Sequence, residues 1–378
     1  MALTGAAPIP KDLFIGLEGV SHLFAGGQSP MLRASRDALI EYCDLKAQGM
    51  SGGDRIHEVE LETRELVARY LGAPGGVGDI ALLGSAAEGF NVLAAAIDWR
   101  PGDTVVSIAN EFPSSVMPWL ARSRAGVSLV AVEPSEDPEA SIEAAITDRT
   151  RVVCVSYVNW LTGMRLDLAR LATAAHARGA ILAVDASQAL GAIRIPIEHC
   201  DVLVSCCYKF QLATQGVGIF YWNRRRIPEL LQPAVGWHSL SDDWEDGTLR
   251  PGAYRLADGA GRFEIGSPPY MALFVLNQAL KVLSAVDRDV VEEWVLDLGG
   301  RLRAGLVSLG LDVWTPDAPA RRGPNIVFGS AECRGIADRL AARGVYATGS
   351  TGRVRFSLHG YNDGEDVDTA LAALAAVL

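Results

Sequence analysis

Lysine is scarce in this chain, and one lysine stands where an amine could do chemistry. Lys209 follows directly on an apolar run at 202–206, whereas Lys11, Lys46 and Lys281 have ordinary explanations in an N-terminal arm or on helix faces. The carboxyl end of a buried strand is where α/β sheets place their ligands. A desolvated lysine there can lose its proton and attack a carbonyl carbon. The alternative is a lysine that reaches from a strand end into solvent.

The preceding strand delivers a carboxylate to the same edge of the sheet. The apolar run 181–184 ends at Asp185, which is followed by Ala186, Ser187 and Gln188. Such an aspartate can simply cap a helix. Opposite the ring nitrogen of pyridoxal 5'-phosphate (PLP), however, a carboxylate keeps that nitrogen protonated, so that the ring can accept the electrons of a substrate carbanion. Asp185 and Lys209 together indicate a PLP site.

Two other turns add weaker signals. The small residues of the run 84–91 follow a short apolar stretch and open a helix, where free backbone N–H groups and the helix dipole favour a phosphate. Neither GxxxxGK[ST] nor GxGxxG occurs there, which argues against nucleoside triphosphates and dinucleotides. After the next apolar stretch, Phe112 offers a ring that could stack on a flat cofactor, although core packing is the commoner role of such a ring.

The elements that must position these residues alternate between short apolar runs and helical patterns. This rhythm predicts an α/β fold with a mostly parallel, seven-stranded sheet. A smaller α+β region follows, with strands expected at 311–314, 325–328 and 354–357. We expect an N-terminal arm at 1–29, a large domain at 30–262 and a small C-terminal domain at 263–378. The seven strands are predicted at 80–83, 104–108, 127–132, 152–157, 181–184, 202–206 and 217–222.

Composition narrows the class of protein. The 378 residues carry a formal net charge of −11 and 49% hydrophobic residues, which fits a globular protein and disfavours nucleic-acid partners. The sequence has no leader-like start and no long apolar stretch, so we expect a cytoplasmic protein that does not bind membranes. Its six cysteines lack the spacing of a zinc site or a disulfide framework, so we expect buried free thiols and no metal.

The segments 184–191 (VDASQALG) and 205–210 (SCCYKF) resemble the class V aminotransferases, a family of fold type I PLP enzymes that includes cysteine desulfurases, kynureninases and isopenicillin-epimerase-like enzymes. The resemblance runs from residue 84 to residue 362. It implies that Lys209 is the Schiff-base lysine, that Asp185 pairs with the ring nitrogen, and that Gln188 donates to the phenolic oxygen of the cofactor. It also implies that Phe112 stacks on the ring.

The same resemblance assigns the remaining contacts. Ser205 and Tyr208 match phosphate contacts, although many relatives carry His at the position of Tyr208, and Asn159 or Trp160 falls near the residue that adjusts the cofactor oxygen or the substrate. Ser85 opens the phosphate turn, where Ala86 and Ala87 replace the threonines of relatives and leave more of the binding to the backbone.

Substrate and subunit contacts also follow from the resemblance. Arg355 matches the arginine that binds the substrate α-carboxylate. Ser267, after Gly266, matches a segment that reaches the phosphate of the partner subunit, which implies a homodimer. His22 in the arm is a candidate substrate contact, with a structural role as the alternative. The loop 236–257 is expected to help sort substrate side chains.

One difference from cysteine desulfurases directs the choice of reaction. The segment 347–354 (ATGSTGRV), just before Arg355, has no cysteine to accept a persulfide. We therefore predict a carbon–sulfur β-lyase acting on an S-substituted L-cysteine through quinonoid and aminoacrylate intermediates. Aminotransferase, decarboxylating deaminase and epimerase remain alternatives because they share the first steps. A non-catalytic binding protein is a remote alternative, since Lys209, Asp185, Gln188 and Arg355 are all retained.

Overall fold

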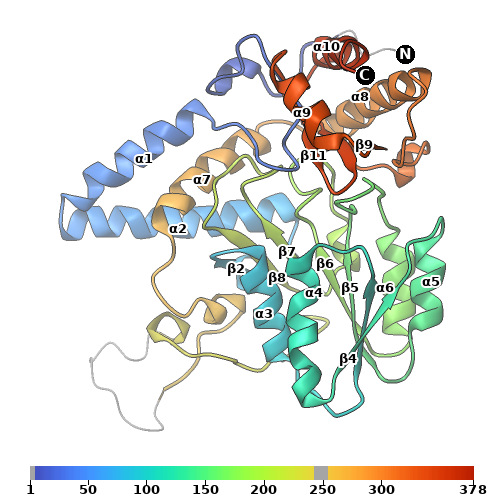
Figure 1. The fold of residues 1–378 in the computed structure, drawn as a ribbon. Helices are drawn as coiled ribbons and strands as arrows, with labels where there is room; N and C mark the ends of the chain where they lie inside the picture. The colour runs from blue at the N-terminus through green and yellow to red at the C-terminus, as the bar shows by residue number, and fades with distance from the viewer. Residues whose placement is uncertain (1–4, 242–253) are drawn as a thin grey trace.

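A seven-stranded sheet forms the centre of the computed structural model, which describes residues 5–241 and 254–378. The strand order is β2-β8-β7-β6-β5-β3-β4 (Figure 1). β8 runs antiparallel to both of its neighbours and the other pairs are parallel, so the predicted mostly parallel sheet is confirmed. The strands are β2 (Ile80–Leu83), β3 (Thr104–Ile108), β4 (Ser128–Val132), β5 (Thr150–Ser156), β6 (Ile181–Asp185), β7 (Val202–Cys206) and β8 (Gly218–Trp222).

Helices cover both faces of this sheet, because successive side chains of a strand point to opposite sides and both sets are apolar. Leu83 and Val204 belong to the core that holds Phe90, whereas Leu82 and Leu203 belong to the core on the other face. α3 (Ala86–Ala96) and α4 (Pro113–Leu120) cover the first face. The second core includes side chains of α2 (Met50–Leu71), α5 (Pro138–Ala145), α6 (Leu168–His176) and α7 (Tyr270–Ser284).

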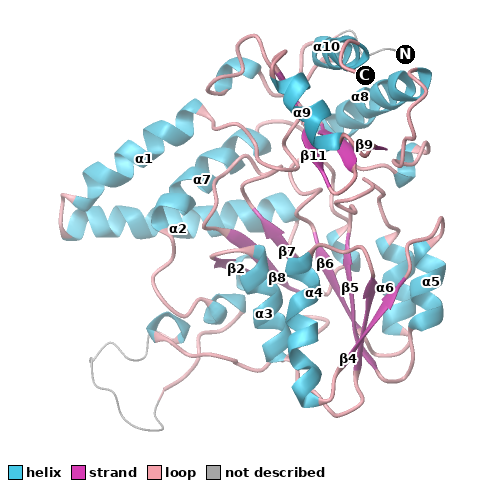
Figure 2. Cartoon of the chain, viewed as in Figure 1, coloured by secondary structure: helices cyan, strands magenta, loops and turns pink. Residues whose placement is uncertain are grey.

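A second, antiparallel sheet lies above the carboxyl ends of the large sheet in the view of Figure 2. Its order is β11-β12-β9, with β9 (Asn325–Gly329), β11 (Thr348–Ser350) and β12 (Arg353–Ser357). The helices α8 (Arg288–Ser308), α9 (Cys333–Ala341) and α10 (Gly364–Ala375) surround it. The strand predicted at 311–314 is wrong, because that segment makes only an isolated bridge between Val313 and Phe328.

The N-terminal arm joins the C-terminal part of the chain. Its strand β1 (Ser21–His22) pairs in parallel with β10 (Val345–Tyr346), so part of the arm belongs to a two-stranded sheet. α7 lies beside α1 (Arg33–Lys46) and α2 in Figure 1. The division of the chain at 262/263 stays a prediction, and much of the predicted sorting loop 236–257 lies outside the described residues.

Two sequence expectations concern the molecule as a whole. Within the described residues, no helix is both long and apolar enough to cross a membrane. The cysteines are free, as expected, and five of them are buried. Cys43 on α1 is exposed, so the prediction of burial was wrong for this residue, which lies on the polar face of the helix.

Candidate active site

The parallel strands end at one edge of the large sheet, where a pocket of about 200 Å³ opens. Asp185 ends β6, Cys206 ends β7, and the first residues of the turn after β2 complete one wall. The pocket brings together the predicted residues Ser85, Ala86, Ala87, Phe112, Asp185, Gln188, Tyr208 and Lys209. A concave site with a few convergent polar groups is the usual form of a small-molecule site.

Asp185 and Lys209 are both buried in this pocket. The backbone N–H of Ser187 donates to Asp185 Oδ1 over 2.8 Å, which fixes the carboxylate at the strand end. Burial raises the pKa of Asp185, while the hydrogen bonds from Ser187 and the charge of Lys209 oppose that rise. A buried carboxyl of this kind gains stability when a cation lies opposite it, which is what a protonated pyridine nitrogen supplies.

Aromatic rings surround the lysine amine. Lys209 Nζ lies 5.3 Å from the ring centroid of Phe112 and 5.5 Å from that of Tyr208. The ring of Trp160 meets Phe112 edge to face, with centroids 5.4 Å apart, and its Nε1 donates to the carbonyl of Asn110 over 2.9 Å. These rings form an apolar wall that can exclude water from a planar cofactor.

The turn after β2 begins helix α3 beside the pocket. Ser85 caps α3 by accepting the N–H of Glu88 over 3.1 Å, and the Glu88 carboxylate accepts the N–H of Gly84 over 2.7 Å. A Cβ on Gly218 would lie 2.7 Å from the Ser85 carbonyl carbon and 3.0 Å from Ala86 N, so only glycine lets β8 approach this turn. The backbone at Ala86 and Ala87 therefore faces the pocket without side-chain hydroxyls.

The register of β7 differs from the one that the resemblance implied. Cys206 and Tyr208 line the pocket, whereas Ser205 points to the other side, where its hydroxyl donates to the Cys206 carbonyl and accepts from Gln211 over 2.8 Å. Alternation along the strand explains the difference, because neighbours face opposite ways. Burial raises the pKa of Tyr208 to about 12, so its hydroxyl stays protonated and can donate.

The structure also shows which of Asn159 and Trp160 faces the pocket. Asn159 Oδ1 accepts from the backbone N–H groups of Leu161 and Thr162, and its Nδ2 donates to Asn110 Oδ1, so Asn159 ties a turn together. Trp160 is the member of the pair that lines the pocket. The sequence placed both near the site but could not give the orientation of a turn residue.

Gln188 connects the pocket to two distant segments. Its Nε2 donates to the carbonyl of Gly26 in the arm over 3.0 Å, and its Oε1 accepts from Asn325 of β9 over 2.9 Å. A Cβ on Gly26 would fall 2.8 Å from Gln188 Oε1, so the arm passes at the closest possible distance. Gln188 thus ties together the large sheet, the arm and the small sheet.

Besides Ser205 and Asn159, three more predicted residues lie outside the pocket lining. Arg355 is buried on β12 and donates to the carbonyl of Trp160 over 3.0 Å. His22 lies within hydrogen-bond distance of the Tyr361 hydroxyl, with His22 Nδ1 and Tyr361 Oη 2.9 Å apart, and burial lowers the pKa of His22 to about 4. Ser267 is exposed before α7.

Two polar residues at the site were not assigned a role from the sequence. Glu111 follows β3 and is buried, and its Oε1 accepts the backbone N–H of Ser156 at the end of β5 over 2.7 Å. Ser156 lines the pocket, and its hydroxyl donates to the other oxygen of Glu111. Burial raises the pKa of Glu111 to about 7. In the sequence, the signal for both residues was a polar side chain at or just after the end of an apolar strand.

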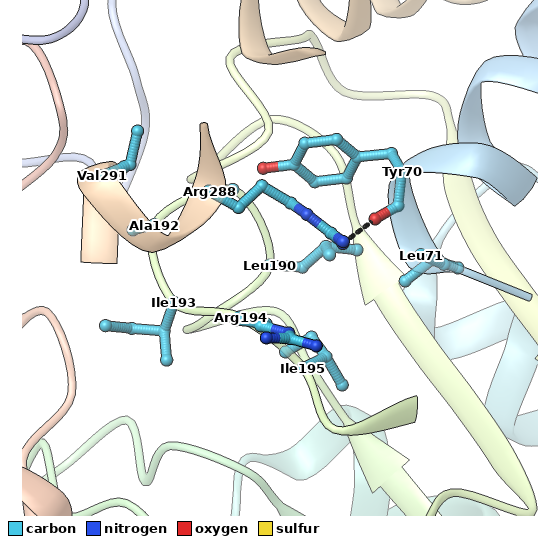
Figure 3. A pocket seen from close by; sticks show the side chains of 10 residues that line it. Tyr70, Leu71, Leu190, Ala192, Ile193, Arg194, Ile195, Arg288 and Val291 are labelled. Carbon is cyan, nitrogen blue, oxygen red and sulfur yellow. Dashed lines mark hydrogen bonds between the residues drawn. The ribbon is translucent and has the colours of Figure 1, made fainter. Parts of the chain in front are cut away.

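Other hollows and clusters do not match this chemistry. The hollow in Figure 3, between Tyr70, the loop 190–195 and α8, has room of about 10 Å³ and holds none of the predicted residues; Arg288 donates there to the Tyr70 carbonyl. Glu60, His238 and Glu264 lie close enough to share an ion. Arg64, however, donates to the carboxylates of both glutamates and already supplies them with a shared cation.

Comparison with known proteins gives a consistent result. A family model described as "Aminotransferase class-V" matches residues 31–370. A kynureninase of Deinococcus radiodurans is 30% identical over 298 residues, which cover 76% of this chain and 71% of that protein.

Two solved structures of C-DES share the fold. One is a lysine-to-alanine variant with glycine covalently linked to the PLP cofactor; it has a TM-score of 0.88 at 20% identity and covers 97% of this chain and 99% of that chain. The other is described as the cystine C-S lyase C-DES with its reaction product cysteine persulfide. It has a TM-score of 0.87 at 21% identity and covers 96% of this chain and 99% of that chain.

Proposed function

The chain belongs to the class V aminotransferase family and is a PLP-dependent enzyme, and on this premise we propose that it cleaves the carbon–sulfur bond of an S-substituted L-cysteine. The reaction consumes one water and releases a thiol, pyruvate and ammonium. Aminotransferase, decarboxylating and epimerase activities belong to the same family and are the outcomes against which this proposal is tested.

The donor set of the pocket fits the cofactor. Lys209 offers an amine for its aldehyde carbon, Asp185 a carboxylate for its ring nitrogen, and the start of α3 an anion site for its phosphate. Phe112 is proposed to lie on its ring face. When bound, PLP supplies an electron sink for the bonds at the substrate α-carbon.

The residues of the chain then have separate proposed tasks. The amine of Lys209, which lines the pocket, would serve as the base that takes the α-proton. Asp185 holds the proton on the ring nitrogen throughout. Trp160 and Phe112 exclude water, and Arg355 is proposed to orient the α-carboxylate from the small sheet. Ser267 is proposed to act across the interface of a homodimer.

The observation that carries the lyase proposal is the absence of a reactive thiol. The described segment before Arg355 forms β10 and β11 and contains no cysteine. Cys206 lines the pocket, but burial raises the pKa of its thiol, and the protonated thiol is a poor nucleophile. Direct expulsion of the sulfur group from the β-carbon needs no protein persulfide.

The test is product analysis with purified holoenzyme and an S-alkyl-L-cysteine. We expect thiol, pyruvate and ammonium in equal amounts, in wild type and in Cys206→Ser alike, with Cys43→Ser as the exposed control. Stoichiometric amino-group transfer to a keto acid, release of carbon dioxide with an aldehyde, or a persulfide on Cys206 would each overturn the lyase proposal. The assignment of the cofactor site would survive any of these results.

A further inference from the structure

Two arginines stand side by side on the face of β12 that is turned toward the active site. Arg353 and Arg355 are two residues apart on one strand, so their side chains leave the same face. They are 1% and 4% exposed. Arg353 Nη2 and Arg355 Nη1 both donate to a single acceptor, the carbonyl oxygen of Trp160, over 3.1 and 3.0 Å.

Neither guanidinium has a counter-ion among residues 5–241 and 254–378, where no carboxylate oxygen lies within 4.0 Å of either. Their other partners are neutral: Arg353 donates to the carbonyl of Ser350 and the hydroxyl of Thr351, and Arg355 donates to Thr348 Oγ1 over 3.4 Å. The Nε atoms of both are buried and unpaired. Buried charge without an opposite charge is costly, so this pair is arranged for an anion that the chain itself does not supply.

The charge balance supports the same conclusion. Burial lowers the pKa of Arg353 to about 10, and burial together with the charge of Arg353 lowers the pKa of Arg355 to about 9. Both groups are still cationic at neutral pH. One substrate carboxylate can pair with one guanidinium through two parallel hydrogen bonds, which leaves the second positive charge uncompensated.

The pair also lies next to the pocket. The guanidinium carbon of Arg353 is 4.5 Å from the ring centroid of Trp160, and this ring lines the pocket that holds Lys209. A substrate that enters past Trp160 therefore meets Arg353 as well as Arg355. A purely structural Arg353 would need only its contacts to Ser350 and Thr351, which close the turn between β11 and β12, and not its charge.

We infer that the substrate carries two anionic groups, with the α-carboxylate at Arg355 and a second anionic group, at the end of the side chain, at Arg353. This inference rests on the proposed function, and for an S-substituted cysteine it means that the sulfur substituent ends in an anionic group such as a carboxylate.

The test uses direct binding to the holoenzyme by isothermal titration calorimetry. The probes are succinate, glutarate and adipate, each compared with the monocarboxylate of the same carbon number. We expect wild type to prefer at least one dicarboxylate by about tenfold or more. Arg353→Gln should abolish this preference and leave the monocarboxylate affinity unchanged, Arg353→Lys should retain part of it, and Arg355→Gln should weaken both probes.

Equal affinity of wild type for the two kinds of acid would overturn the inference. Equal weakening of both in Arg353→Gln would also overturn it, because that result means that Arg353 only supports Trp160. If the dicarboxylate preference is present but S-conjugates are not cleaved, the lyase proposal fails and this inference stands. If S-conjugates are cleaved but wild type shows no dicarboxylate preference, this inference fails and the lyase proposal stands.

Discussion

Asp185 and Lys209 are the residues on which the proposed cofactor chemistry depends, and each can be tested alone. We expect Asp185→Asn to fold but to lose at least about a hundredfold in turnover, because an amide cannot hold the ring nitrogen protonated as a carboxylate does. The absorption spectrum of the bound cofactor should change as well. Turnover close to that of wild type would mean that Asp185 only accepts the N–H of Ser187.

Borohydride reduction of the holoenzyme should fix the cofactor on Lys209 and on no other lysine. Lys281 is the matched control, since it lies on α7 in an ion pair with Glu62. Peptide mapping of wild type, Lys209→Ala and Lys281→Ala checks this result. Label that persists in Lys209→Ala would contradict the assignment.

His359 predicts how stability changes in acid. It is fully buried, its Nδ1 accepts the N–H of Gly360 over 2.7 Å and its Nε2 donates to the carbonyl of Phe210, next to Lys209. Burial lowers its pKa from 6.5 to about 4. Between these values the unfolded chain binds the proton and the folded chain does not, so stability falls as the pH drops through this range, by about 3 kcal/mol in total.

His359→Gln, which keeps a donor toward Phe210, should therefore flatten the fall in the free energy of unfolding between pH 6.5 and pH 4. His22 contributes in the same direction, so part of the fall remains. Urea denaturation at several pH values measures this effect, and the exposed His57 on α2 provides the control through His57→Gln. An unchanged acid branch in His359→Gln would show that His359 does not contribute.

At the scale of elements, Gly191 lets the loop after β6 pack directly against the backbone of Phe210, the residue after Lys209. Gly191 has φ of 113°, and a Cβ there would lie 1.9 Å from the carbonyl oxygen of Phe210. Gly179, with φ of 67°, has open space around it. Gly179→Ala should cost about 1 kcal/mol of stability from backbone strain alone, and Gly191→Ala about 3 kcal/mol or more because the Lys209 segment must move.

Thermal unfolding and cofactor absorbance of the two variants give the comparison. Gly179 controls for positive φ, and the difference between the variants reports the collision with Phe210 together with the larger strain at φ of 113°. Equal losses in the two variants would mean that the loop after β6 yields without consequence.

The elements also show what the sequence could and could not reveal. β2, β3 and β7 have the predicted bounds, because continuous apolar runs between turns leave little choice. The reversed direction of β8 was not predicted, because apolar strands of either direction look alike; the short connection from β7 was the available signal, since a parallel crossover needs more residues. β11 was missed because its three residues are small and polar.

The site divides in the same way. Residues that end strands, such as Asp185 and Lys209, could be placed, because strand direction fixes the edge on which they lie. The sequence could not show which of Ser205 and Cys206 faces the pocket, because that depends on the register of β7. The sequence did not indicate a role for Arg353, because the argument for that role depends on its contact with Trp160, which lies far away in the sequence.

At the scale of the whole molecule, the proposed homodimer implies an interface that can be tested. A hollow of about 570 Å³ lies between α1 and α7, and it is lined by apolar side chains that include the exposed Met271. We expect Met271→Arg to weaken self-association, because a charge would be buried there on pairing. Val307→Arg, an equally exposed apolar position on α8, should not. Sedimentation velocity distinguishes the two, and a monomeric wild type would contradict the prediction.

The pairing of β1 with β10 sets the earliest point during synthesis at which the arm can reach its place in the fold. β1 leaves the ribosome before β10, which follows the whole of the large sheet in the chain. Until then β1 has no strand to pair with, and the strand that bears Arg353 does not exist. A nascent chain therefore contains Lys209 before its arm can pair with β10. A chain that stops short of residue 345 lacks both β10 and the strand that bears Arg353.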